Sequence, residues 1–205
     1  MSQIALPFDW PADETRENFI VTSSNEDAVN QMEHWGSWPI PAALLVGPRM
    51  SGRSLLGRIF AAKTGGHLID DAERKPETEI FHRWNLAMET RRPLLVVASV
   101  LPPEWRIGLP DLRSRMNATR HLVIGEPDEK LSAALIEKIL ARRGLTMAPD
   151  VMKYALARLP RLYHALIDFA ERADYTAIAQ QRGVTIPLVR QVLAVSTNHL
   201  LRAQF

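Results

Sequence analysis

One short segment of the chain combines glycine, arginine and serine at a spacing that can bind phosphate. It reads Gly47-Pro48-Arg49-Met50-Ser51-Gly52-Arg53-Ser54. This matches the phosphate-loop pattern G-x-x-x-x-G-K-[ST] at every position except Arg53, which replaces lysine. In this pattern, backbone N–H groups and a helix N-terminus surround the phosphates, and the serine hydroxyl holds Mg²⁺. We therefore predict a nucleotide site formed by these eight residues, with Ser54 as a magnesium ligand.

Arginine at position 53 keeps the positive charge of the lysine but not its shape. A guanidinium is planar, longer and forked. It can bind an anion without taking the position that a compact ammonium occupies during phosphoryl transfer. We therefore expect intrinsic hydrolysis to be weak or absent.

The segments on either side of the loop are those that the motif requires. Residues 42–46 form an apolar run that predicts a buried parallel strand. Residues 54–63 carry apolar side chains at helical spacing, so the loop joins a strand to a helix.

Two carboxylates, Asp70 and Asp71, follow the short apolar segment 67–69. A carboxylate at the end of a strand beside a phosphate loop holds magnesium through water, and its neighbour orients the attacking water. We assign the first role to Asp70 and the second to Asp71. The other interpretation is an acidic helix cap at a strand end.

Composition limits the class of protein. A chain of 205 residues can bury a sizeable core, and the absence of cysteine excludes disulfides and thiolate metal sites. A net charge of +2 is too small to argue for nucleic acid by itself. The sequence shows no secretion signal and no apolar run of membrane-spanning length, so we expect a cytoplasmic protein.

The order of the predicted elements divides the chain into three parts. Residues 1–18 are rich in proline and acidic side chains and predict a flexible arm. Residues 19–126 alternate strands and helices, which indicates an α/β core with a parallel sheet. Residues 127–205 show only helical patterns and predict a helical lid, with a hinge at Glu126-Pro127-Asp128.

Taken together, these segments resemble the AAA+ ATPases and, within them, the DnaA/Hda family of bacterial replication proteins. The segments that carry the resemblance are Phe19-Ile20-Val21 with Ser24-Asn25-Glu26, the phosphate loop, Leu68-Ile69-Asp70-Asp71, Phe81-His82-Arg83-Trp84-Asn85-Leu86 and Leu109-Pro110-Asp111-Leu112-Arg113-Ser114-Arg115.

The resemblance assigns roles to four further residues. Arg115 corresponds to an arginine finger, which reaches the nucleotide of a neighbouring subunit. Ser99 matches the first sensor position, although a serine after a strand is also an ordinary turn residue. In the lid, the family places a sensing arginine where this chain has His164, with Arg161 one helical turn earlier. A mostly neutral histidine is a poor replacement for a permanent cation.

The arm carries a second family marker. Gln3-Ile4-Ala5-Leu6-Pro7-Phe8 looks like the peptide by which replication proteins bind the DNA polymerase sliding clamp. The resemblance assigns Gln3 to a polar pocket and Leu6, Pro7 and Phe8 to an apolar contact. Alternatively, Leu6, Phe8 and Trp10 fold back onto the domain as a hydrophobic latch.

The chain also departs from the family in length. Only Thr64, Gly65 and Gly66 separate the phosphate-loop helix from the aspartate strand, where the family inserts another strand and helix. Either one of the usual five strands is missing, or residues 67–71 take its place. In the second case the acidic pair is not the magnesium site.

The resemblance implies a regulator of replication initiation that binds the sliding clamp and promotes ATP hydrolysis by the initiator DnaA. Its own cofactor would be ATP or ADP with Mg²⁺. Two alternatives are a noncatalytic paralogue that competes for clamp or initiator, and an autonomous weak ATPase. No direct sequence-specific DNA binding is expected, because Arg190 and Arg202 are too sparse to follow a phosphate backbone. Self-association is left open.

Overall fold

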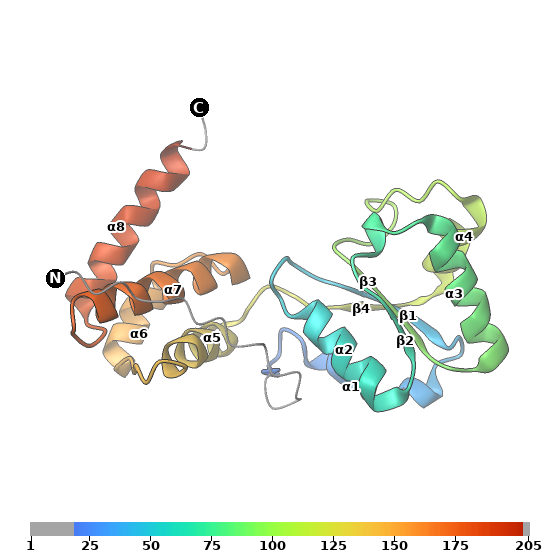
Figure 1. The fold of residues 1–205 in the computed structure, drawn as a ribbon, viewed down its shortest axis with the longest axis horizontal. Coiled ribbons are helices and arrows are strands. Elements are labelled where there is room, and N and C mark those ends of the chain that lie inside the picture. The colour runs from blue at the N-terminus through green and yellow to red at the C-terminus, as the bar shows by residue number, and fades with distance from the viewer. Residues whose placement is uncertain (1–18, 203–205) are drawn as a thin grey trace. The chain divides into compact units, whose positions relative to one another are not determined.

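The computed structural model describes residues 19–202, and from residue 195 onward it describes the backbone only (Figure 1). This part of the chain forms two compact units, an α/β core that extends to Glu126 and a helical lid that begins at Pro127. Each unit contains its own cluster of buried apolar side chains.

The core is built on a parallel sheet of four strands in the order β2-β3-β1-β4. Every residue of β1 and β3, the two central strands, is buried. Strands covered on both faces consist of nearly continuous apolar residues, which is why the apolar run 42–46 predicts β1 correctly. The strands are β1 (Ala42–Val46), β2 (His67–Ile69), β3 (Leu94–Ala98) and β4 (Arg120–Val123).

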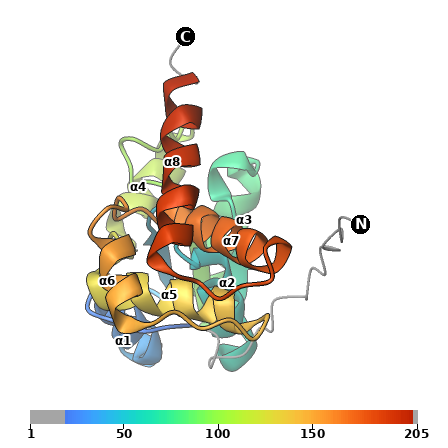
Figure 2. The ribbon, with the colours of Figure 1, turned by 90° about the vertical axis from the view of Figure 1, so that its left-hand side faces the viewer.

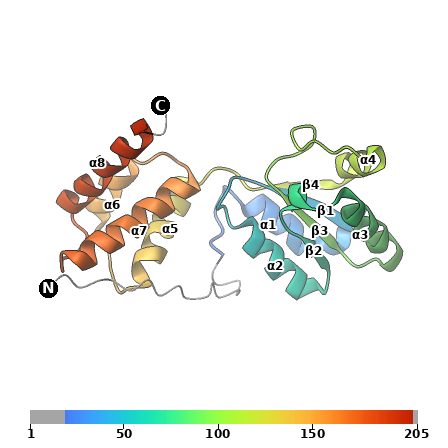
Figure 3. The same cartoon turned by 45° about the horizontal axis from the view of Figure 1, so that its top comes forward.

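Helices cover both faces of this sheet. Helices α1 and α2 lie on one face, and α3 and α4 lie on the other (Figures 1 and 3). On the second face, Leu44 and Val96 pack with Ile80, Leu112 and Met116. The core helices are α1 (Glu26–Glu33), α2 (Arg53–Thr64), α3 (Glu77–Thr90) and α4 (Pro110–Ala118), with short 3₁₀ helices at Trp35–Ser37 and Ala72–Arg74.

The lid consists of helices packed around a second apolar cluster (Figure 2). Asp128 caps its first helix, because the carboxylate accepts a hydrogen bond of 2.7 Å from Leu131 N. Among residues 19–202, no helix combines the length and apolarity needed to cross a bilayer. The lid helices are α5 (Glu129–Ala141), α6 (Pro149–Leu156), α7 (Tyr163–Ala179) and α8 (Ile186–Arg202).

A buried asparagine fixes the chain that leads into α1. The helix begins at Glu26, and the side chain of Asn25, the residue before it, does not cap it. Asn25 is buried, and its amide accepts from Thr22 N and donates to Ile20 O, both at 2.9 Å. Asn25 therefore fixes the chain that leads into α1.

The short segment between α2 and β2 leaves no room for another strand. Gly65, at φ +66°, ends α2, and β2 begins at His67. A Cβ at Gly66 would lie 2.4 Å from Pro93 O, so the chain passes close beside the segment entering β3. His67 N donates to the same carbonyl at 2.8 Å. The result is a sheet with four strands in the described part of the chain, one fewer than the family usually has.

Candidate functional site

The predicted phosphate loop lies between β1 and α2, at the carboxyl edge of the sheet. A Cβ at Gly47 would lie 2.8 Å from Ile124 Cβ and 2.9 Å from Ile124 O, so only glycine fits there. Gly52 has φ +86°, a conformation that glycine adopts without strain. Ser51 Oγ is buried and has no hydrogen-bond partner among the described residues. This loop can bind an anion through its backbone N–H groups and the N-terminus of α2.

Arg53, the residue that replaces the motif's lysine, is directed to the end of β3. Its Nη1 donates a hydrogen bond to Ala98 O. On the other side of the same peptide group, Ser99 N donates to Glu73 Oε1. Arg53 and Glu73 therefore hold one peptide group between them, and the phosphate cradle is left mainly to backbone N–H groups.

Sequence reasoning does not find Glu73, although it lies only three residues after Asp70. No spacing rule connects an acidic residue in a short 3₁₀ helix with the end of a strand 26 residues later. The side chain of Ser99, the candidate sensor, is exposed while its backbone N–H is engaged.

The two residues predicted to hold magnesium lie together. Ser54 Oγ donates to Asp70 Oδ1 at 3.1 Å, and Asp71 N donates to the same oxygen at 3.0 Å. A hydroxyl and a carboxylate are ligands that Mg²⁺ accepts, with water and phosphate oxygens completing the octahedron. No group of three or more His, Asp and Glu side chains suited to a metal occurs in residues 19–202. The Ser54 hydroxyl and the Asp70 carboxylate thus suit a Mg²⁺ ion that nucleotide phosphate oxygens also coordinate.

Asp71 is exposed and has φ +51°. Its side chain caps no helix, so the alternative of an acidic cap does not apply to it. The contact between Asp70 and Ser54 also argues against the alternative in which residues 67–71 replace the outer strand away from the phosphate loop.

Arg115, the candidate arginine finger, contacts three side chains of α3. Its guanidinium carbon lies 4.1 Å from the ring centroid of Phe81 and 4.4 Å from that of Trp84. Its Nη1 donates to Asn85 Oδ1. Two aromatic faces and an amide thus hold a half-buried cation by charge–quadrupole attraction and a charge-assisted hydrogen bond.

Arg115 lies at the opposite edge of the sheet from the phosphate loop of its own chain. It is in the last turn of α4, which is followed at Arg120 by β4. Arg120 pairs in register with Ala43, at the start of β1, whereas the phosphate loop follows the end of β1. The end of α4 that carries Arg115 thus lies away from the phosphate loop of its own chain.

The remaining candidates lie elsewhere. Arg161 and His164 are exposed at the beginning of α7 in the lid, one just before the helix and one in its first turn. Their sensing role stays a prediction. The clamp-binding candidates in the arm, and the latch alternative, fall on residues 1–18, outside the described part of the chain.

A parallel sheet with a phosphate loop between β1 and α2, followed by a helical lid, is the arrangement of the AAA+ fold. Solved structures agree with this fold. Domain III of DnaA from Thermotoga maritima aligns with a TM-score of 0.72 at 16% identity, over 90% of this chain and 98% of that one. AMPPCP-bound DnaA from Aquifex aeolicus gives 0.58 at 20% identity, over 78% and 63%. The RuvB Holliday junction branch migration motor of Thermotoga maritima gives 0.63 at 13% identity, over 90% and 72%.

The lid of this chain also matches a family model. Residues 128–193 match the model described as Hda, lid domain. Together with the DnaA-like fold, this match makes the chain similar to DnaA/Hda-like AAA+ proteins.

Proposed function

We propose that this chain is an Hda-like regulator of DNA replication initiation in the cytoplasm. It docks on the sliding clamp through Gln3, Leu6, Pro7 and Phe8, and it presents Arg115 to ATP bound by the initiator DnaA. The observation that carries the proposal is the position of Arg115 at the edge of the sheet opposite its own phosphate loop. We take Arg115 at that edge to serve a reaction in a partner's site.

The chain's own nucleotide has a structural role in this proposal. ATP or ADP would bind with its phosphates on the backbone N–H groups that residues 47–54 provide, Pro48 having none, and Ser54 and Asp70 would hold Mg²⁺. Bound Mg²⁺ neutralises charge between the phosphate oxygens. Asp71 orients water near the outer phosphate, and Arg161 and His164 keep the sensing role expected of them. Arg53 donates to Ala98 O instead of reaching the outer phosphates, which supports nucleotide binding without hydrolysis by this chain.

At the partner's site, Arg115 acts by electrostatic stabilisation. Its guanidinium donates hydrogen bonds to phosphate oxygens as charge develops on them during hydrolysis. No covalent step on this chain is required. The cost of desolvating the guanidinium is already met in part, because it lies against the rings of Phe81 and Trp84.

The direct test is initiator ATP hydrolysis measured with clamp loaded on DNA and with or without this chain. Wild-type protein should accelerate hydrolysis, and Arg115→Ala should remove most of that acceleration, since an arginine finger contributes about 10³-fold or more. Arg113→Ala, on the same helix and exposed, is the matched control. Equal stimulation by wild type and Arg115→Ala would remove Arg115 from the mechanism.

Clamp binding is tested separately by pull-down with purified clamp. Combined Gln3→Ala and Leu6→Ala substitutions should abolish retention, because the polar and the main apolar anchor are both lost. The control is Arg115→Ala, which should be retained like wild type. If the unmodified chain does not bind, the docking part of the proposal is wrong.

A second candidate is a noncatalytic competitor for clamp or initiator. It is favoured by one observation, that Arg115 is engaged by side chains of its own domain. The same hydrolysis assay separates the two: a regulator raises the initiator's rate, whereas a competitor lowers it when a known regulator is also present.

A further inference from the structure

Helix α3 contacts both ends of α4, the helix that carries Arg115. At the beginning of α4, the two carboxylate oxygens of Glu77 accept hydrogen bonds from Gly108 N at 2.7 Å and Leu109 N at 2.6 Å. At its end, Trp84 Nε1 donates to Thr119 Oγ1 at 3.3 Å. Leu109 and Thr119 are the two capping residues of α4.

These contacts come from one face of one rigid element. Residues 77 and 84 are seven positions apart, which is two helical turns or about 10 Å along the axis. Asn85, the hydrogen-bond acceptor of Arg115, follows Trp84 directly. Helix α3 thus supplies an anchor for the start of α4, one for its end, and one for the guanidinium itself.

Glu77 makes the stronger of the two end contacts. The first N–H groups of a helix have no partner within the helix. The Leu109 side chain cannot accept from them, and α4 has no side-chain cap of its own. The half-buried carboxylate of Glu77 does not bind these N–H groups but accepts from Gly108 N and Leu109 N, which immediately precede the helix and lie where its dipole also favours negative charge.

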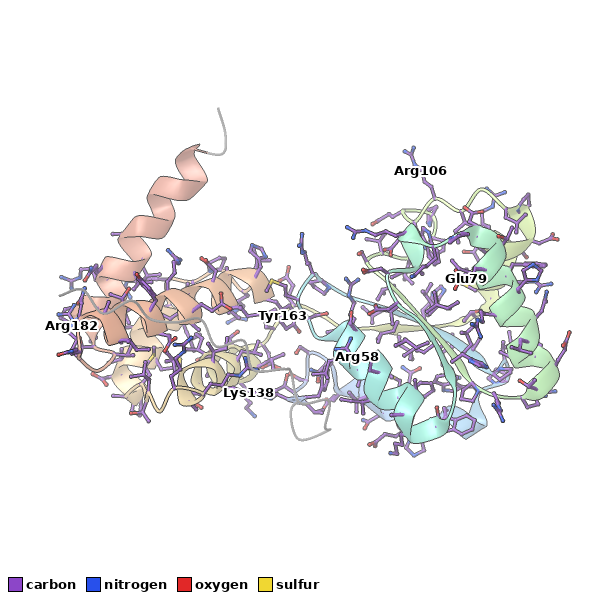
Figure 4. All side chains as sticks on the ribbon, viewed as in Figure 1. Arg58, Glu79, Arg106, Lys138, Tyr163 and Arg182 are labelled. Carbon is purple, nitrogen blue, oxygen red and sulfur yellow. The ribbon has the colours of Figure 1, made fainter. Side chains whose placement is uncertain are left out.

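We propose that Glu77 and Trp84 are positioning residues for Arg115. Glu77 fixes where α4 begins, Trp84 fixes where it ends, and the guanidinium is thereby presented in one orientation. The proposal rests on the proposed function of Arg115, because positioning matters to a reaction only if Arg115 takes part in it. Figure 4 labels Glu79 on α3 and Arg106 in the loop that leads into α4, so the two segments can be followed there.

The test uses full-length Glu77→Ala, Glu77→Gln and Trp84→Phe, with Glu79→Ala as the matched control. Glu79 is an exposed glutamate in the same first turn of α3, so it controls for lost charge at that helix end. Gln keeps one acceptor oxygen, and Phe keeps the aromatic face but loses the N–H donor. Initiator hydrolysis is measured against the concentration of each variant.

Glu77→Ala should lower the maximal stimulated rate by about 10-fold or more at an unchanged half-saturating concentration, since small displacements of a catalytic group cost up to about 100-fold. Glu77→Gln should restore part of the rate, Trp84→Phe should lower it less, and Glu79→Ala should match wild type. Equal maximal rates for Glu77→Ala and Glu79→Ala, with active wild type, would overturn the proposal. Inactive wild type would instead overturn the proposed function.

Amide hydrogen exchange tests the structural part of the proposal, that Glu77 fixes the start of α4, without an activity assay. The amides of residues 108, 109, 111 and 112 should exchange faster in Glu77→Ala than in wild type, and those of α3 should not. Unchanged exchange at Gly108 and Leu109 overturns the proposal whatever the hydrolysis assay gives. Faster exchange with an unchanged maximal rate also overturns it, because the position of α4 would then not control Arg115.

Discussion

At the scale of single residues, the substitution of arginine for lysine in the phosphate loop acquires a structural explanation. Arg53 donates to Ala98 O, and Glu73 accepts from the N–H of the same peptide group. The sequence alone indicates a changed phosphate ligand. It does not reveal the contact, because the partner is a backbone carbonyl 45 residues away.

This contact predicts that Arg53 contributes to stability more than to nucleotide affinity. Arg53→Ala should lower the unfolding free energy by about 1–3 kcal/mol, because the Ala98 carbonyl loses a charged donor. Nucleotide affinity should fall less than about 10-fold, since backbone N–H groups hold the phosphates. Denaturant unfolding and calorimetry with ADP measure the two effects, and Arg49→Ala, exposed in the same loop, is the control. Lost nucleotide binding at unchanged stability would show that Arg53 is instead a phosphate ligand.

At the scale of elements, apolar periodicity in the sequence predicts most strands and helices. Strand β1 occupies the predicted residues 42–46, β2 occupies the apolar segment 67–69, and α2 extends one residue beyond each end of the predicted 54–63. Helix ends are less certain than helix centres, because polar residues there fit a helix and a turn equally well. The spacing of apolar residues indicates which face of a helix or strand is buried, so it shows where these elements lie in the sequence.

Contacts between elements are less predictable. The run from Phe81 to Asn85 is a family marker in the sequence, but its contact with Arg115 appears only in the structure. Such a contact depends on how α3 and α4 lie beside each other, which no local pattern encodes. The same holds for Glu77, whose carboxylate reaches backbone groups 31 and 32 residues later. Conversely, the sequence does predict that Ser54 and Asp70 are adjacent, because carboxyl ends of parallel strands meet at one edge.

At the scale of the whole molecule, the described chain consists of two units, each stabilised by its own apolar cluster. A polar pair also contributes in the lid. Asp174, 8% exposed on α7, forms an ion pair of 3.0 Å with Arg143 from the segment after α5. Its second oxygen is buried and has no hydrogen-bond partner among the described residues. Burial raises the pKa of Asp174 above its ordinary value, and the Arg143 charge opposes this only in part.

This raised pKa predicts a pH dependence of lid stability with a definite sign. The folded state holds the Asp174 proton more tightly than the unfolded chain does. This contribution to the unfolding free energy is therefore complete below the unfolded pKa and is lost as pH rises through the folded pKa. The Asp174→Asn variant has no titratable group at this position, so it lacks this contribution to the unfolding free energy. The stability of wild type relative to Asp174→Asn should thus increase as pH falls through this window.

Denaturant unfolding of both proteins across acidic pH, followed by a lid-specific signal such as amide exchange at Tyr163 or fluorescence of a lid label, measures this difference. Asp168→Asn removes the same charge from an exposed position on α7, where Asp168 pairs with Arg172 at 2.8 Å, and so controls for lost charge alone. A difference between wild type and Asp174→Asn that stays constant or shrinks as pH falls would mean that Arg143, and not burial, dominates at Asp174. The pair would then stabilise the lid most above the pKa of the carboxyl group, and the sign of the pH dependence would reverse.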